Sequence, residues 1–375
     1  MNREDISVLI VDDSALMRNL IGRIIDSAEG LTLAGKAMNG VFALQKIPKL
    51  NPDVIVLDIE MPEMNGIEFL KERKKQGIAI PVVILSSVAQ KGAKITMEAL
   101  SLGASDFITK PSGSISTDIH TVGEQLVELL RGLGAKYRKS GKKPEKTETP
   151  EGIVRRPTPP PPKPAYKPTP VKKIDLTPVR QTGAIELIAI GISTGGPNAL
   201  REVFSNISAD IRQPIVIVQH MPQGFTYEFA KSLDRICPLE VKEAEDGDIL
   251  KAGRVLIAPG NQHIIVEKKS LASVVRLLDT GHVNGHRPSV DVLFESVSRN
   301  YKNHALAVIM TGMGRDGARQ IGSIYREGGY TIAQDEKSSI VFGMPRVAIE
   351  SGAITKVVPL KEMAGVISET AKKFG

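Results

Sequence analysis

Short apolar runs that each end in a polar or glycine residue constrain the fold of this chain most strongly. In the first part of the chain these runs cover Ile6–Val11 and residues 54–57, 82–85 and 107–109. In the last part they cover residues 187–190, 215–218 and 305–310. Helix-like stretches such as Ala15–Ser27 lie between them, and this alternation predicts parallel sheets with helices on both faces. We therefore predict an α/β chain with a doubly wound, five-stranded parallel N-terminal domain and a doubly wound, mainly parallel C-terminal domain.

A proline-rich and basic segment separates the two sets of runs. Between Arg138 and Thr182 there are twelve Lys and Arg residues and four Asp and Glu residues, a net charge of +8. The segment also contains Pro159 to Pro162 and has no apolar periodicity, which is typical of a solvated, partly polyproline-II linker. We predict a first domain over residues 1–130, a linker over residues 131–182 and a second domain over residues 183–375.

The overall charge of +7 would by itself suggest a nucleic-acid partner, but the position of the positive charges along the chain argues against one. Because the linker carries +8, the rest of the chain carries −1, and no basic folded face is expected. No apolar run approaches the ~20 residues that a membrane span needs. The single cysteine, Cys237, fits a reducing compartment, and the first residues have no signal-peptide pattern. We expect a cytoplasmic protein that binds no nucleic acid and is not embedded in a membrane.

In the first domain the strand ends carry three carboxylates, a hydroxyl and a lysine. Asp12 and Asp13 follow the first run and Asp58 ends the second, while Ser86 and Lys110 follow the later runs. The carboxyl ends of parallel strands share one edge of a sheet, where ligands bind. Clustered carboxylates repel one another unless a cation joins them, and Mg²⁺ prefers oxygen ligands. An aspartate can also attack phosphorus and form an aspartyl phosphate.

These residues, in this order and with Pro62 and Pro111 beside them, resemble the receiver domain of two-component response regulators. The resemblance implies that Asp58 is the phosphoacceptor and that Asp13 binds Mg²⁺ directly, with support from Asp12. It implies further that Ser86 and Lys110 contact the phosphoryl group. Phe107 falls where receivers carry an aromatic switch residue.

In the second domain three candidate catalytic residues follow strand-like runs. Ser193 lies in Gly191-Ile192-Ser193-Thr194-Gly195, a match to the G-x-S-x-G turn that exposes a serine hydroxyl. His220 follows the next run and could serve as its base, and Asp316 could orient the imidazole. Free backbone N–H groups where the next helix starts could stabilise an oxyanion. The order Ser, His, Asp differs from that of α/β-hydrolases, so an ordinary member of that fold is not expected.

Several alternatives involve the same part of the chain. The segment from Gly312 to Gly317 also matches the dinucleotide pattern G-x-G-x-x-G, but few residues follow it and it leaves Ser193 and His220 without a role. His282 and His286 lie in a glycine-rich segment that favours a structural or substrate-facing loop over a metal site. His263 is a weaker candidate for the base. Asp291 is the main rival of Asp316 as the acid, although its place at a helix start is typical of capping.

Four segments of the second domain together resemble chemotaxis protein-glutamate methylesterases. They are Ser193-Thr194-Gly195-Gly196, His220-Met221-Pro222, the segment from Arg287 to Asp291 and Met313-Gly314-Arg315-Asp316-Gly317. The resemblance implies Ser193 as nucleophile, His220 as base and Asp316 as the orienting acid. Thr194 and Met313 fall in family positions near the oxyanion site, with Gly195 beside them.

The resemblance implies a carboxylic ester hydrolase of chemotactic adaptation that removes methyl groups from glutamate γ-methyl esters of chemoreceptors. Deamidation of receptor glutamines by the same chemistry is expected as well. The implied partners are methyl-accepting chemoreceptors and a chemotaxis histidine kinase, and the implied cofactor is Mg²⁺ in the receiver domain, with none in the esterase site. An unphosphorylated receiver is expected to cover the Ser193 crevice. An inactive phosphorylation-dependent binding protein and a transcriptional regulator are the other function classes, and the second lacks a helix-turn-helix pattern.

Overall fold

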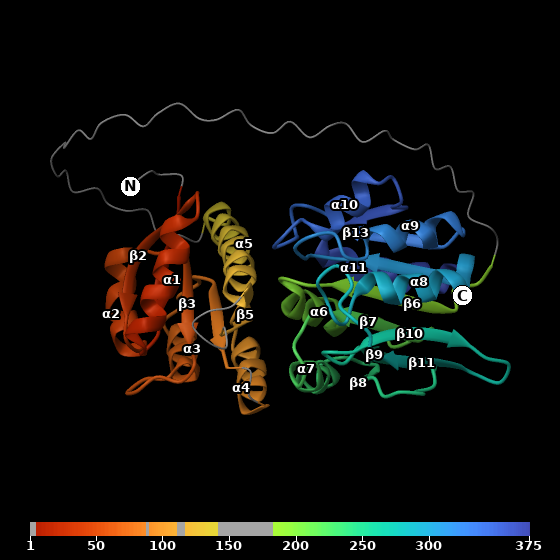
Figure 1. Cartoon of the computed structure of the whole chain (residues 1–375), viewed down its shortest axis with the longest axis horizontal. Coiled ribbons are helices and arrows are strands. Elements are labelled where there is room, and N and C mark those ends of the chain that lie inside the picture. The colour runs from red at the N-terminus through yellow and green to blue at the C-terminus, as the bar shows by residue number, and fades with distance from the viewer. Residues whose placement is uncertain (1–4, 88–89, 111–116, 142–182) are drawn as a thin grey trace.

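The predicted alternation of strands and helices is present in both halves of the chain (Figure 1). The computed structural model describes residues 5–87, 90–110, 117–141 and 183–375. The elements of the N-terminal domain are β1 (Ile6–Val11), α1 (Ala15–Ser27), β2 (Leu31–Ala37), α2 (Gly40–Leu50), β3 (Val54–Asp58), α3 (Gly66–Lys75), β4 (Val82–Ser86), α4 (Gln90–Ser101), β5 (Asp106–Thr109) and α5 (Thr117–Lys139).

The N-terminal strands form a five-stranded parallel sheet in the order β2-β1-β3-β4-β5. Because successive side chains of a strand point to opposite faces, β1 and β3 supply two separate cores. Val8, Ile10 and Val56 pack with residues of α1 and α5. Leu9, Leu57 and their neighbours pack with residues of α2, α3 and α4 on the other face. The predicted doubly wound fold is confirmed.

Helix α5 continues past residue 130, where the sequence analysis places the start of the linker. Leu133 and Tyr137, four residues apart, are buried and extend the apolar face of the helix. At the next residue, Arg138 Nη2 lies 2.6 Å from the buried Asp53 Oδ2. Residues 131–139 therefore belong to the folded domain, and the rest of the predicted linker, residues 142–182, lies outside the described residues.

The described part of the second domain starts at residue 183 and contains a larger sheet. Its elements are β6 (Leu187–Ile192), α6 (Gly196–Ser205), β7 (Ile215–Gln219), α7 (Phe225–Asp234), β8 (Glu240–Glu243), β9 (Arg254–Ile257), β10 (His263–Lys268), β11 (Ser273–Leu278), α8 (Val290–Tyr301), the short 3₁₀ helix η1 (Lys302–His304), β12 (Ala305–Ile309), α9 (Ala318–Arg326), β13 (Tyr330–Gln334), α10 (Met344–Glu350), β14 (Lys356–Val358) and α11 (Leu360–Lys373).

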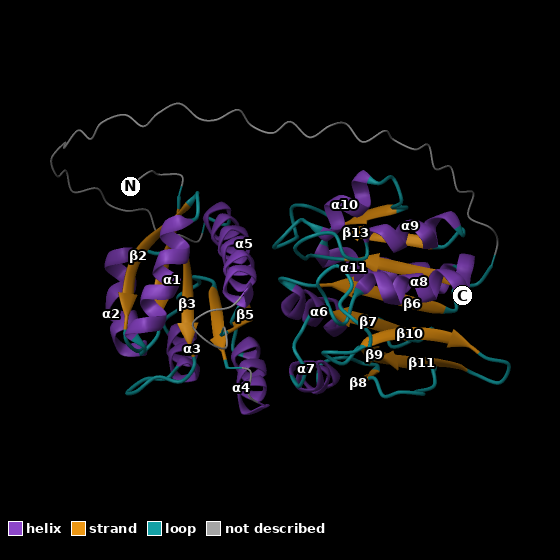
Figure 2. Cartoon of the chain, viewed as in Figure 1, coloured by secondary structure: helices purple, strands orange, loops and turns teal. Residues whose placement is uncertain are grey.

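Within the described residues, seven of these strands pair in parallel in the order β14-β13-β12-β6-β7-β9-β8. Strands β10 and β11 form a separate antiparallel ribbon, which Figure 2 shows beside the main sheet. Helices lie on both faces of the main sheet, so the predicted mainly parallel, doubly wound fold is confirmed. At the central strand β6, a Cβ on Gly191 would lie 2.2 Å from Val290 Cγ1. Glycine at this position thus allows α8 to approach the strand that leads to Ser193.

The two domains meet directly, with α4, α5 and β5 of the first facing α6 and α7 of the second (Figure 1). Phe107 of β5 stacks on Phe225 of α7 with ring centroids 5.0 Å apart and planes 8° apart. Asn198 of α6 donates to the carbonyl oxygens of Ala104 and Ser105 at 2.9 and 2.8 Å. Ile340 packs against the core of the first domain. None of the helices described in the structure is long and apolar enough to cross a membrane.

Candidate active site and its regulatory partner

The acidic strand ends of the first domain meet at one edge of its sheet. Carboxylate oxygens of Asp12, Asp13 and Asp58 all lie within 4.8 Å of one another. Lys110 Nζ lies 2.7 Å from Asp58 Oδ2 and 3.4 Å from Asp12 Oδ2. Burial works to lower the pKa of Lys110, but its hydrogen bond to Asp58 and the charges of both aspartates raise it. Ser86 Oγ accepts a hydrogen bond from Thr96 Oγ1 at 2.6 Å.

This cluster fits a divalent cation. Asp12 Oδ2 is buried and has no hydrogen-bond partner among the described residues, with only the Lys110 ammonium near it. Burial raises the pKa of both Asp12 and Asp58, and Lys110 opposes this only in part, as expected of clustered carboxylates that a single ammonium does not fully balance. Oxygen donors of this kind are the ligands that Mg²⁺ prefers. Within the described residues, no other group of acidic, histidine or cysteine side chains could hold a metal ion in this way.

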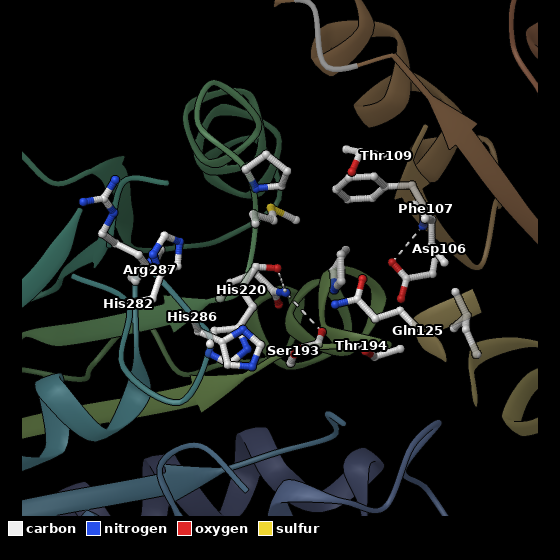
Figure 3. Close-up of a pocket in the computed structure, with 18 residues that line it drawn as sticks. Asp106, Phe107, Thr109, Gln125, Ser193, Thr194, His220, His282, His286 and Arg287 are labelled. Atoms are coloured by element: carbon white, nitrogen blue, oxygen red, sulfur yellow. Dashed lines mark hydrogen bonds between the residues drawn. The ribbon is translucent and has the colours of Figure 1, made fainter. Parts of the chain in front are cut away.

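In the second domain the strand ends bring Ser193 and His220 to the edge of one cavity, and Asp316 contacts His220. Ser193 follows β6 and His220 follows the neighbouring β7, so the two residues lie side by side at the carboxyl edge of the sheet. Asp316 lies in the loop between β12 and α9, and its Oδ2 is 2.9 Å from His220 Nε2. All three side chains are buried or nearly so. Asp316 thus contacts His220, and Figure 3 shows Ser193 and His220 beside the same cavity.

The Asp316 carboxylate is surrounded by donors. Its Oδ2 accepts from the backbone N–H of Val290 at 2.6 Å, and its Oδ1 accepts from Ser289 Oγ and Asn284 Nδ2, both at 2.8 Å. The N–H of Asp291 adds a longer contact of 3.2 Å. Burial alone would raise the pKa of Asp316, but the hydrogen bond and charge of His220 and these donors lower it well below its usual range. Asp316 therefore stays ionised beside the imidazole.

The imidazole of His220 is held between two partners. Asp316 engages Nε2, and the ring of His286 stacks on the other side with centroids 3.7 Å apart and planes 10° apart. His220 Nδ1 is buried and has no hydrogen-bond partner among the described residues. Because Nε2 must donate to the ionised Asp316, Nδ1 carries the free lone pair and can accept a proton. Burial, together with the neighbouring His220, lowers the pKa of His286 to about 4, so His286 is neutral near pH 7.

The turn after Ser193 presents backbone N–H groups. Gly195 has a φ of 79°, in the left-handed region that favours glycine, and it precedes α6. Gln219 braces the turn, because its Nε2 donates to the carbonyl oxygen of Ser193 at 3.0 Å. A cavity of about 280 Å³ lies over Ser193, Thr194 and His220. Residues of the first domain line the same cavity, among them Asp106, Phe107 and Gln125 (Figure 3).

One of these residues binds the nucleophile turn. Asp106 Oδ2 accepts a hydrogen bond of 2.6 Å from the N–H of Gly195. Asp106 is buried, and burial raises its pKa to about 6, although the N–H groups of Gly195 and Phe107 act in the opposite direction. A carboxylate of the first domain thus occupies one of the N–H groups expected to stabilise an oxyanion.

Comparisons with known proteins agree with this arrangement. Residues 8–118 match the family described as response regulator receiver domain, and residues 188–367 match the family described as CheB methylesterase. A protein-glutamate methylesterase/protein-glutamine glutaminase of Treponema denticola is 60% identical over 99% of this chain and 100% of its own length. A protein of the same name from Treponema pallidum is 50% identical over 100% of this chain and 99% of its own length. The chain belongs to the CheB methylesterase family.

A solved structure is also similar to part of the chain. The crystal structure of the Thermotoga maritima CheB methylesterase catalytic domain is 39% identical, covers 50% of this chain and 99% of its own, and has a TM-score of 0.48. The two domains of this CheB chain are called the receiver domain and the esterase domain below.

Some of the remaining predicted residues lie at the cavity over Ser193 and others do not. Thr194 lines the cavity over Ser193, and Gly195 follows it in the same turn, as expected. Met313 does not line this cavity but lines a groove together with α1 and α5 of the receiver domain. His263 is fully buried, with Nε2 beside the Gly281 carbonyl and Nδ1 accepting from Ser289 N–H, so its role is structural. Asp291 lies in the first turn of α8, but Ser289 is the N-cap, and the Asp291 carboxylate accepts from Asn284 Nδ2 and the N–H of Gln320, so capping of α8 does not explain it. The loop from Gly312 to Gly317 positions Asp316.

Sequence reasoning missed several residues around the site. Asn284 and Gln219 carry no motif, and Ser289 lies in the motif from Arg287 to Asp291 without an assigned role. Their contacts with Asp316 and Ser193 indicate a role for each. His286 was assigned to a structural or substrate-facing loop, and its ring lies against the base. The Asn284-Gly285 pair is a signal for a tight hairpin turn, which could have directed attention to this loop.

Proposed function

We propose that this CheB chain hydrolyses glutamate γ-methyl esters of chemoreceptors in the cytoplasm, under control of phosphorylation at Asp58. The same chemistry would deamidate receptor glutamines. The observation that carries the proposal is that Ser193 and His220 line one cavity while the ionised Asp316 contacts His220, because the esterase reaction needs a nucleophile, a base and an orienting acid.

The proposed reaction begins at Ser193. His220 Nδ1 takes the Ser193 Oγ proton as the oxygen attacks the ester carbonyl, and Asp316 stabilises the imidazolium through Nε2. Backbone N–H groups of the turn at Thr194 and Gly195 stabilise the oxyanion. Methoxide is a poor leaving group, so the imidazolium protonates it and methanol leaves. Water activated by His220 then cleaves the glutamyl–Ser193 ester and releases the glutamate carboxylate.

In the receiver, Asp12, Asp13 and Asp58 would hold Mg²⁺, which neutralises charge on the incoming phosphoryl group. Asp58 would accept the phosphoryl group from a chemotaxis histidine kinase. Lys110 already contacts Asp58 and is placed to pair with the phosphoryl oxygens. Ser86 lies beside this site and offers a hydroxyl to the phosphoryl group.

The closed arrangement of the domains supports inhibition of the unphosphorylated protein. Asp106 and Phe107 line the cavity over Ser193, and Asp106 occupies the N–H of Gly195. Both residues belong to β5, the strand that leads to Lys110 at the phosphorylation site. Changes at Lys110 on phosphorylation would therefore reach the interface through one short strand, and would favour an open state.

The test is methanol release from methylated chemoreceptor membranes, with and without Mg²⁺ and a small-molecule phosphodonor. Ser193→Ala should abolish release, and Asp58→Ala should abolish only the response to the phosphodonor. Ser205→Ala, at the exposed end of α6, is the matched control and should behave as the unaltered protein. Absence of release from the unaltered protein under every condition would contradict the esterase proposal and favour the inactive binding protein.

A further inference from the structure

A two-residue turn touches both the base and the acid of the esterase site. Asn284 and Gly285 have φ values of 54° and 80°, and Val283 and His286 exchange two backbone hydrogen bonds around them. These features are those of a type I′ hairpin turn, for which Asn-Gly is strongly preferred. The turn places Asn284 against Asp316, and His286 follows it directly against the ring of His220.

The amide of Asn284 bridges two carboxylates. Its Nδ2 donates to Asp316 Oδ1 at 2.8 Å and to Asp291 Oδ2 at 2.7 Å. Because both partners are carboxylate oxygens, the NH₂ group must face them, and its two hydrogens serve one carboxylate each. Asp316 is 1% exposed and Asp291 8% exposed, so water contributes little to separating their charges.

Without this bridge, two buried carboxylates would face one another. Like charges at such a site disfavour double ionisation, and one carboxylate then takes up a proton at higher pH. The other ionisable groups near the pair are His220 and His286 on the side of the catalytic serine, with His282 beyond His286 and Arg319 of α9 beside Asp291. Of these groups only His220 contacts Asp316 directly, as far as the described hydrogen bonds show.

We propose that Asn284 is a positioning residue, which keeps Asp316 ionised and aimed at His220 by donating to Asp316 and Asp291 together. The inference deepens the proposed esterase function and rests on it. Asn284 itself touches no reacting atom, and it acts through Asp316.

The test compares pH profiles of kcat/KM for methanol release by the full chain, phosphorylated in the presence of Mg²⁺. Asn284→Gly removes the amide and leaves the positive φ unstrained, so the turn is preserved. We expect the acidic limb of the profile to move up by about one pH unit, a loss of about tenfold at the acid end, because one hydrogen bond to a charged group is lost. Near pH 9 the loss should be smaller.

A second substitution distinguishes charge repulsion from a general loss of structure. Asp291→Asn removes the rival charge and retains an oxygen for the N–H of Gln320, which Asp291 accepts at 3.1 Å. The double variant Asn284→Gly with Asp291→Asn should recover the unaltered acidic limb. A uniform loss at all pH values that Asp291→Asn does not repair would overturn the proposal.

A measurement without substrate keeps the inference separate from the esterase proposal. The imidazole resonances of His220, assigned with a His220→Gln variant, can be titrated by NMR in the unaltered chain and in Asn284→Gly. A midpoint that moves to lower pH in Asn284→Gly supports the positioning role, because a protonated Asp316 no longer stabilises the imidazolium, and this holds even if methanol release is absent and the esterase proposal fails. An unmoved midpoint, with methanol release intact, would reject the role of Asn284 alone.

Discussion

The Asp106 carboxylate of the receiver accepts a 2.6 Å hydrogen bond from the N–H of Gly195, two residues after Ser193. The contact joins a buried acid, which forms no ion pair with the described residues, to the turn that follows Ser193. In the proposed mechanism, the Asp106 carboxylate of the closed state and the oxyanion of the reaction therefore compete for the N–H of Gly195. Four predictions follow from this contact and from the two sites it connects.

The first prediction concerns pH and the closed state. Asp106 has a pKa of about 6 when the domains are closed, and undocking would return it to water, where a carboxyl group titrates near 3.8. The closed state therefore binds the proton more tightly, so docking strengthens as the pH falls from 7 toward 4. Lys136, also at the interface, has its pKa lowered by burial to about 8 and titrates outside this range.

This effect can be measured as the distance between labels on the two domains from pH 5 to pH 7.5. Asp106→Asn keeps an oxygen for Gly195 N–H without the charge, and it should stay closed throughout and lower the unphosphorylated activity at pH 7. Docking that weakens on acidification would show that another group controls the interface.

The second prediction concerns the aromatic pair. Phe107→Ala removes the stack on Phe225, and aromatic pairs contribute about 0.5–1.5 kcal/mol beyond the area that they bury. The open population, and with it the unphosphorylated methanol release, should rise by about twofold to tenfold. Phe42→Ala, on α2 and 39% exposed, is the control and should leave release unchanged. Equal rates of methanol release for the unaltered protein, Phe107→Ala and Phe42→Ala would show that the stack of Phe107 on Phe225 does not contribute to inhibition.

The third prediction concerns the metal. Removing Mg²⁺ with a chelator should abolish phosphoryl transfer to Asp58, because Asp12 and Asp13 would repel the phosphodonor without the cation. Basal methanol release should be unaffected, since the esterase chemistry proposed here uses only side chains and backbone N–H groups. Phosphoprotein gels and methanol release, run on the same samples, check both statements. A chelator that stops basal release would indicate a metal requirement in the esterase.

The fourth prediction concerns the glycine opposite the nucleophile. A Cβ on Gly312 would lie 2.7 Å from Ser193 Cβ and 2.4 Å from Met344 Sδ. Gly312→Ala should therefore displace Ser193 and lower kcat strongly, by about 10²-fold as for a 1 Å displacement of a catalytic group. The matched control is Gly365→Ala on α11, where a Cβ meets no atom within 4 Å. This control should keep full activity, and a normal rate in Gly312→Ala would contradict the close packing of the site.

The strands, and with them the positions of the candidate site residues at their ends, could be predicted because buried parallel strands are continuous apolar runs in the sequence. β6 and β7 are buried along their whole length, so their ends, and hence Ser193 and His220, could be found from the sequence. The contacts of Asn284 and His286 with the site could not be predicted in this way. Both residues lie in a loop, and no local sequence pattern shows where a loop lies in the folded chain. Residues 131–139 were misread because the charges of Arg138 and Lys139 hid the buried face ending at Tyr137.

The location of Met313 and the contact of Asp106 depend on how the domains dock. No periodicity within either domain specifies a neighbour in the other. Asp106 precedes Phe107 at the start of a strand, where an acidic residue is most simply a solvated end. Only the three-dimensional interface shows that its carboxylate binds Gly195.

Strand β5 connects Asp106 to the lysine of the phosphorylation site over four residues, about 13 Å of extended chain. In the proposed mechanism, the signal passes from β5 to the esterase domain through the non-covalent interface between the two domains. The covalent connection then determines only how often the domains meet, in the manner of a tether. Receiver and esterase supplied as two separate polypeptides would accordingly remain a working switch at sufficient concentration. The length of the connecting chain could change during evolution without altering the signal that passes between them.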